Sequence, residues 1–191
     1  MLADLITSKS RVTLLQVFLA SPYEMFHVRE LVRRTKDEIN AVRRELQFLE
    51  NKGILTKEPR ANRVYYAFSK TYPFYHDLLV IGAKISGLGG EILKNRAKLG
   101  KIKYALLSGK FVKRIKNKPD EVDVVIIGTV VLPEVTLLIR NEETRLATEI
   151  NYTAMTEEEF NFRKTKRDPF VLSLLSSSKV MLIGDEETLL A

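Results

Sequence analysis

The spacing of apolar residues changes at Gly53, and this change constrains the fold of the first half of the chain more than any other feature. Before it, apolar residues recur at intervals of three and four, at Ile39, Val42, Leu46 and Leu49. This spacing predicts an amphipathic helix over residues 37–52, and Gly53 suits the left-handed position that ends a helix. After Gly53, two short runs rich in β-branched and aromatic residues predict strands. A helix followed directly by a β-hairpin is therefore expected here.

Two more helices are expected before this one, and a longer one after the hairpin. Residues 11–20 are mostly apolar and are ended by Ser21-Pro22, because proline disfavours a helical conformation of the preceding residue. Residues 27–35 place their apolar side chains on one face. The hairpin strands are predicted at 54–57 and 64–69, and the following helix at 72–86. The order helix–helix–turn–helix–hairpin is the pattern of a winged helix-turn-helix.

The second half of the chain mixes strands with helices, which predicts an α+β fold with a small mixed α/β second domain. We place domains at residues 1–88 and 89–191, with the Gly87–Gly90 run as a helix break between them. Residues 135–140 fit either a helix or a strand. The other expected elements are strands at 104–107, 122–127, 147–154 and 180–183, and helices at 91–101, 156–163 and 168–175.

Charge is distributed unevenly along the chain. The formal net charge is +7, but residues 1–83 carry +4, residues 84–118 carry +10 and residues 119–191 carry −7. A basic front and an acidic back favour an anionic partner at the front. The basic stretch from Lys94 to Lys118 leaves several alternatives open: a wider DNA footprint, a nucleotide or RNA, the acidic second domain of a partner chain, or a solvated surface.

Composition excludes several classes of site. The chain has no cysteine, which excludes disulfides and thiolate metal ligands, and its two isolated histidines argue against a protein-built zinc site. No apolar run is long enough to span a bilayer, and residues 1–10 do not resemble a signal peptide. We therefore expect a cytoplasmic protein with no membrane partner.

The outer face of the helix at 37–52 carries the side chains that recognise base edges. They are Asn40, Arg43, Arg44 and Gln47. Arginine pairs in a bidentate way with guanine, and Asn or Gln with adenine, so double-stranded DNA is the expected partner. We expect a phosphate to bind at Lys36 and the helix N-terminus. At the hairpin tip, we expect Arg60 and Arg63 to contact an adjacent minor groove or phosphates.

The alternative is an ordinary solvated helix face. Glu45 and Glu50 lie on the same helix and favour this alternative, because they would repel phosphate if they pointed toward it.

Several segments resemble the winged-helix repressors of the arsenical-resistance and multiple-antibiotic-resistance type over residues 8–86. The matching segments are HVRELVRRT, AVRRELQFLENKGIL and RVYYAF. The resemblance implies a DNA-binding transcriptional regulator. It also implies a homodimer that pairs through the helices at 11–20 and 72–86.

Residues 104–155 resemble the small nucleotidyltransferase domains of the DNA polymerase beta type. In that family a Gly-Ser turn binds the nucleotide phosphates, and three carboxylates hold magnesium ions on the nucleoside triphosphate. The corresponding nucleotide-binding positions here are Ser108, Gly109 and Lys110. The carboxylate positions fall at Glu121 and Asp123 and within the Glu149–Asn151 segment.

Each of these signatures departs from the family pattern. Lys110 stands where serine is expected, Glu121 where aspartate is expected, and Asn151 where the third aspartate is expected. Losing a carboxylate removes both a metal ligand and its charge, so we expect an inactive site that serves ligand sensing or assembly, with Asp123 as the remaining candidate magnesium ligand.

Two alternatives remain. One is an active magnesium-dependent nucleotidyltransferase, with Glu121, Asp123 and Glu149 as its catalytic carboxylates and the winged domain recruiting its target. That alternative predicts label transfer that Asp123→Ala abolishes. The other alternative is a non-catalytic interaction module.

Overall fold

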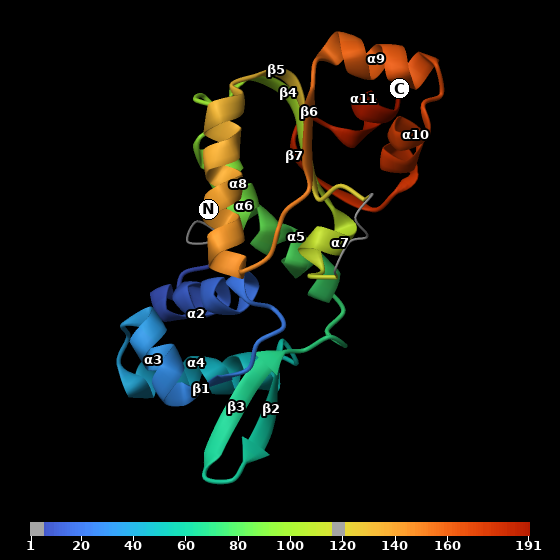
Figure 1. The fold of residues 1–191 in the computed structure, drawn as a ribbon. Coiled ribbons are helices and arrows are strands. Elements are labelled where there is room, and N and C mark those ends of the chain that lie inside the picture. The colour runs from blue at the N-terminus through green and yellow to red at the C-terminus, as the bar shows by residue number, and fades with distance from the viewer. Residues whose placement is uncertain (1–5, 116–120) are drawn as a thin grey trace. The chain divides into compact units, whose positions relative to one another are not determined.

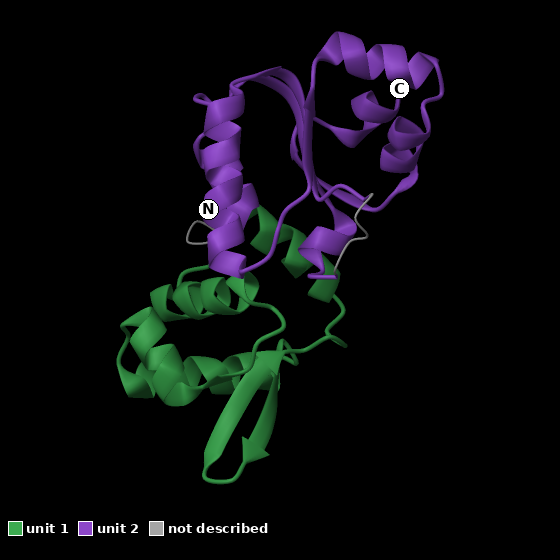
Figure 2. Ribbon diagram, viewed as in Figure 1, with its two compact units in different colours: residues 1–86 green, residues 87–191 purple. Residues whose placement is uncertain are grey.

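The chain folds into two compact units that divide between Ser86 and Gly87 (Figures 1 and 2). The computed structural model describes residues 6–115 and 121–191. Each unit combines helices with one small sheet, which confirms an α+β fold class. Within the described residues, no helix is both long enough and apolar enough to cross a membrane.

The first unit consists of four helices and a three-stranded antiparallel sheet. The helices are α2 (Lys9–Ala20), α3 (Val28–Thr35), α4 (Ile39–Asn51) and α5 (Tyr75–Ile85). The strands are β1 (Phe26–His27), β2 (Leu55–Arg60) and β3 (Arg63–Phe68), in the order β1-β3-β2. Sequence analysis did not predict β1, because a two-residue strand is too short to show a period. It takes its place by pairing with β3.

Helix α2 lies at the centre of the first unit. Its buried side chains contact α3, α4 and α5, which explains why its apolar residues are not confined to one stripe. The Phe18 ring lies 5.4 Å from that of Phe26 and 6.2 Å from that of Phe68, both edge to face. Gly82 of α5 packs against the backbone of Leu19, where an added Cβ would lie only 3.0 Å from the carbonyl oxygen. These contacts join the hairpin and all four helices in one core.

The second unit is a four-stranded mixed sheet with helices on both faces (Figure 1). Its strands are β4 (Gly100–Ser108), β5 (Val124–Val130), β6 (Tyr152–Met155) and β7 (Lys179–Ile183), in the order β6-β5-β4-β7. β4 is antiparallel to β5 and β7, whereas β5 and β6 are parallel. Helices α6 (Gly87–Lys94) and α8 (Leu132–Leu146) cover one face. The other face is covered by α9 (Glu157–Thr165), α10 (Pro169–Ser176) and α11 (Glu186–Leu190), and the short helix α7 (Gly109–Val112) follows β4.

The glycine run was predicted to break the helix that follows the hairpin. The helix does end, at Ile85, but the glycines themselves form the first half of α6. Leu88 and Ile92 are each 2% exposed, so burial of this helix against α8 offsets the low helix propensity of glycine. Gly87 has a φ of +58°, and a Cβ there would lie 2.9 Å from a carboxylate oxygen of Glu142. The positive φ, which residues other than glycine rarely adopt, is therefore the stronger reason for this glycine.

Two further boundaries differ from the sequence-based predictions. The basic helix expected at 91–101 ends at Lys94, and Gly100 begins β4 instead. The strand expected at 147–154 begins only at Tyr152, because Ala147 is the left-handed C-cap of α8, with a φ of 51°. Residues 135–140, which the sequence left open between helix and strand, are helical and lie in α8.

Candidate nucleic-acid interface

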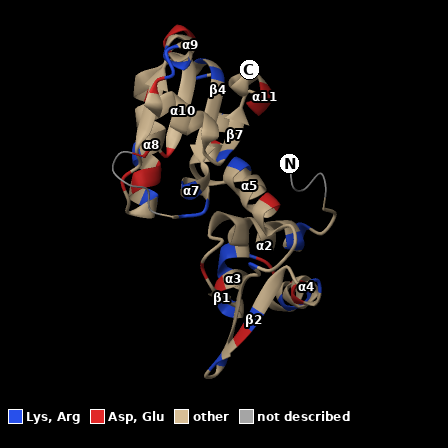
Figure 3. Cartoon of the chain, turned by 90° about the vertical axis from the view of Figure 1, so that its right-hand side faces the viewer, with Lys and Arg blue, Asp and Glu red and all other residues tan. Residues whose placement is uncertain are grey.

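Helix α4 separates a fully buried face from an exposed polar face. Val42, Leu46 and Leu49 are each 0% exposed. The four residues predicted to contact bases, Asn40, Arg43, Arg44 and Gln47, are all exposed. Figure 3 marks the basic and acidic positions along this helix. The 3.6-residue period places these polar side chains opposite the core, so the predicted residues share the accessible side of α4.

The Glu45 carboxylate is held by α2 rather than presented to solvent. Arg11 Nε donates to Glu45 Oε2 at 2.7 Å, and Ser8 Oγ donates to Glu45 Oε1 at 2.7 Å. Burial alone would raise the pKa of Glu45, but hydrogen bonds from Ser8 and Arg11 and the Arg11 charge hold that pKa below its ordinary value. The Glu45 charge, one of the two that favoured a purely solvated surface, is thus paired inside the first unit, whereas among the described residues the Glu50 carboxylate accepts only the Gln47 amide.

The Arg11 guanidinium also packs on an aromatic ring of α4. Its central carbon lies 3.7 Å from the ring centroid of Phe48, a cation–π arrangement. Arg11 thus links α2 to α4 through Glu45 and Phe48, which lie three residues apart on the same helix. This junction fixes α4 on the core, and sequence analysis did not assign Arg11 any role.

The N-terminus of α4 is capped by the chain's own carboxylate. Glu38 accepts the backbone N–H groups of Asn40 at 2.9 Å and Ala41 at 3.0 Å. The Asn40 N–H lowers the pKa of Glu38, against partial desolvation, and the Ala41 N–H and the charges of Arg44 and Arg43 lower it further. The phosphate expected at this helix end would have to displace Glu38. The predicted partner Lys36 is exposed, at the left-handed C-cap of α3 with a φ of 58°.

Gln47 is engaged by its own helix. Its amide nitrogen donates to Glu50 Oε2 at 3.1 Å and to Asn51 Oδ1 at 2.9 Å. Arg43 and Arg44, by contrast, form no ion pair among the residues that the structure describes. Among the described residues, the two arginines are therefore charged donors on this face without an ion-pair partner.

The hairpin tip presents one paired and one unpaired arginine. Arg60 Nε donates to Glu58 at 2.7 Å, and its guanidinium lies 5.7 Å from the ring centroid of Tyr65. Arg63 faces Arg60 across the strand pair and is exposed, with no ion-pair partner in the described part of the chain. A contact to DNA by Arg60 would compete with Glu58, whereas Arg63 is available.

The turn at residues 108–110 in the second unit follows the predicted order of strand, turn and helix, but internal contacts occupy it. The Ser108 hydroxyl accepts the Phe111 N–H at 3.1 Å, and the Gly109 N–H donates to the Ser178 carbonyl at 2.7 Å. A Cβ at Gly109 would overlap the Ser178 side chain. Packing against residue 178 is enough to explain the glycine.

Two of the predicted catalytic carboxylates are engaged in internal contacts. Glu121 forms an ion pair with Lys110, whose Nζ lies 2.5 and 2.6 Å from the two carboxylate oxygens. Asp123 is 7% exposed and accepts the Asn151 N–H at 2.9 Å, while Glu149 is exposed. Residues 6–115 and 121–191 contain no cluster of three His, Cys, Asp or Glu side chains placed to hold a metal ion.

The described side chains therefore do not fit the two-magnesium arrangement. Two lysines of the predicted basic stretch, Lys116 and Lys118, lie outside the described residues.

Comparisons with protein-family models, with curated proteins and with solved structures found no match to this chain.

Proposed function

We propose that residues 1–86 form a winged helix-turn-helix that binds double-stranded DNA, and that the chain acts as a transcriptional regulator. Helix α4 is the recognition helix and enters the major groove, and β2 and β3 form the wing. The observation that carries the proposal is the exposed pair Arg43 and Arg44. These side chains project from the face of α4 opposite its buried stripe and have no carboxylate partner in the described residues.

The internal pairing of the Glu45 carboxylate supports this proposal. Glu45 is held by Arg11 and Ser8, so this carboxylate is engaged away from the outer face of α4. The charges of Arg43 and Arg44 have no ion-pair partner in the described residues. Each bidentate contact of an arginine with a guanine is worth about 1–3 kcal/mol of discrimination against the wrong base.

We also propose that the protein acts as a homodimer in which α5 contributes to the interface. The exposed apolar side chains of this segment support it: Phe74, immediately before the helix, is 61% exposed and Ile81 is 36% exposed. Two copies related by a twofold axis would present two copies of α4 to half-sites about one helical turn of DNA apart.

For the second unit we propose a role in assembly or ligand sensing rather than nucleotidyl transfer. The ion pair of Lys110 with Glu121, and the hydrogen bond that Asp123 accepts from Asn151, support this role. Lys110 and Asp123 thus make internal contacts at the positions where the nucleotidyltransferase pattern expects phosphate and metal binding.

The test begins with the selection of bound fragments from genomic DNA by the purified full-length protein. A shared palindrome is expected. Arg43→Ala and Arg44→Ala should each weaken binding to that duplex by roughly 5- to 150-fold in fluorescence anisotropy, which corresponds to about 1–3 kcal/mol. The control is Arg140→Ala, which removes an exposed arginine of α8 and should leave binding unchanged. Recovery of fragments without any shared sequence, or binding unaffected by either α4 substitution, would reject the proposal.

A further inference from the structure

Three cations lie close together in the connection from α6 to β4 and at the start of β4. They are Arg96, Lys98 and Lys101, here called the basic corner. All three are exposed, and within the part of the chain that the structure describes none has an ion-pair partner. Three unpaired cations within six consecutive residues form a concentrated positive charge.

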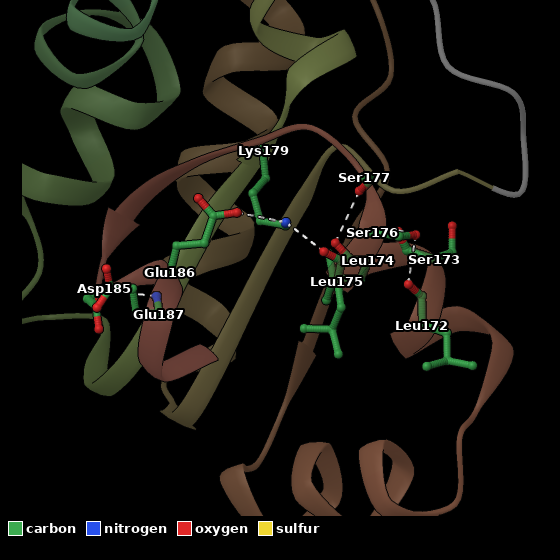
Figure 4. Close-up of polar contacts among 10 residues, drawn as sticks. All are labelled: Leu172, Ser173, Leu174, Leu175, Ser176, Ser177, Lys179, Asp185, Glu186 and Glu187. Atoms are coloured by element: carbon green, nitrogen blue, oxygen red, sulfur yellow. Dashed lines mark hydrogen bonds and ion pairs between the residues drawn. The ribbon is translucent and has the colours of Figure 1, made fainter. Parts of the chain in front are cut away.

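Other basic side chains of this unit are compensated internally. Lys103 pairs with Glu157, and Lys110 pairs with Glu121. Lys179 is 3% exposed and reaches between the Glu186 carboxylate at 3.0 Å and the Leu175 carbonyl at 2.9 Å (Figure 4). The strong positive charge of residues 84–118 is therefore not equally available along its length, and the basic corner is a part of it that remains uncompensated.

The backbone that carries the basic corner is tightly held. Leu99, between Lys98 and Lys101, is 1% exposed, and its carbonyl accepts the Val131 N–H at 2.9 Å. Gly100 adopts a φ of +106°, and a Cβ there would overlap the carbonyl oxygen of Thr129 on β5. The contacts of Leu99 and Gly100 thus hold the backbone between these cations, so less backbone entropy is lost when they bind a ligand.

The unpaired side chains of this corner are cations, which bind phosphate irrespective of the base sequence. The amide of the neighbouring Asn95 donates to the carbonyl and the carboxylate of Glu91, which leaves no free amide to pair with a base. Lysine and arginine that neutralise phosphates release condensed counterions, and this favourable contribution does not depend on sequence. A polyanion with several neighbouring phosphates therefore suits the corner.

We propose that the basic corner binds the phosphate backbone of duplex DNA and forms a second contact surface of the protein. The inference rests on the proposed function of the first unit, because both surfaces bind the same polymer. Two linked surfaces raise the effective concentration of each for the DNA. The basic corner adds affinity and salt dependence, whereas α4 supplies the sequence preference.

The test compares two triple variants of the full-length protein that lose the same charge. The first is Arg96→Gln/Lys98→Gln/Lys101→Gln. The matched control is Arg140→Gln/Lys166→Gln/Arg167→Gln, which neutralises exposed cations elsewhere in the second unit. Anisotropy with a selected duplex and a scrambled duplex is measured over a range of salt concentrations. The slope of log affinity against log salt should fall in magnitude by roughly 2–3 for the first variant and should not change for the control.

The ratio of affinities for the selected and scrambled duplexes separates this inference from the proposed function. It should stay constant in the basic-corner variant and fall in Arg43→Ala. Loss of preference in Arg43→Ala with an unchanged slope in the corner variant overturns the inference alone. An equal fall in slope in the control, showing a general charge effect, also overturns it.

Two further results would also overturn the inference. In both, the basic-corner variant keeps its binding to duplex DNA. It loses its binding either to single-stranded RNA or to vesicles of equal parts phosphatidylcholine and phosphatidylserine. A wild-type protein that binds no duplex rejects both proposals.

Discussion

The proposed interface on α4 can be tested through the contacts that hold this helix on α2. Arg11 and Glu45 lie 34 positions apart in sequence, and their side chains meet at 2.7 Å with exposures of 27% and 16%. A double-mutant cycle made of Arg11→Ala, Glu45→Ala and the double variant isolates the energy of this pair from the other contacts that each residue makes.

Burial, rather than bond length, sets the expected size of the coupling. Hydrogen bonds to charged groups contribute about 1.5–3 kcal/mol, and the partial exposure of Arg11 reduces this, so we expect about 1–2 kcal/mol. The pair Arg60–Glu58 offers a control in the same unit. It has the same 2.7 Å separation but exposures of 55% and 50%. Solvent screening should leave its coupling indistinguishable from zero.

The stability of the first unit is best followed by hydrogen exchange of peptides from α2 and α4 at increasing urea concentration. This measurement reports the opening of these helices separately from the second unit. If the coupling between residues 11 and 45 is no larger than that between residues 58 and 60, burial does not strengthen this ion pair. The account of how α4 is fixed on the core would then be wrong.

Two further predictions follow from the structure. Because the folded state lowers the pKa of Glu45 below 4.5, its contribution to stability is present above that pH and is lost as the pH falls through the folded-state value. The variant Glu45→Gln should therefore lose less stability than the wild type as the pH falls, in the same exchange experiment. An equal dependence of stability on pH in the two proteins would contradict this. Gly100→Ala should destabilise the second unit by about 2–4 kcal/mol in urea unfolding followed by circular dichroism, because the new Cβ would overlap Thr129. The matched control is Gly53→Ala, also at positive φ, where the added Cβ would have no atom within 4 Å. It should cost only about 1–2 kcal/mol of backbone strain. Similar losses of stability in the two variants would refute the steric argument.

Much of the first unit could be predicted because its elements carry their own periodic signal. The apolar stripe of α4 and the strand-forming residues of β3 specify local conformation through neighbours a few positions apart. The exposure of Arg43 and Arg44 follows from the same stripe, because the helical period places them on its opposite side. The N-cap of α4 was missed, since Glu38 is an unusual capping residue.

The second unit was predicted less well, because its glycines and carboxylates carry little local signal. The run Gly87–Gly90 predicts a break in isolation, yet packing against α8 makes it helical. Similarly, nothing near Glu121 in sequence shows that Lys110 will neutralise it, or that Asp123 will accept the N–H of Asn151. These partners are brought together by the sheet.

The amino-acid sequence by itself therefore determined most elements of the first unit, the buried face of α4 and the charged positions, because apolar spacing acts over one or two turns of chain. Only the tertiary structure decided which charges stay available. The Glu45 carboxylate is paired with Arg11 through the packing of α2 on α4, whereas Arg96 has no ion-pair partner among the described residues. Ion pairing depends on distance in space, and for groups tens of residues apart that distance is set by the packed core.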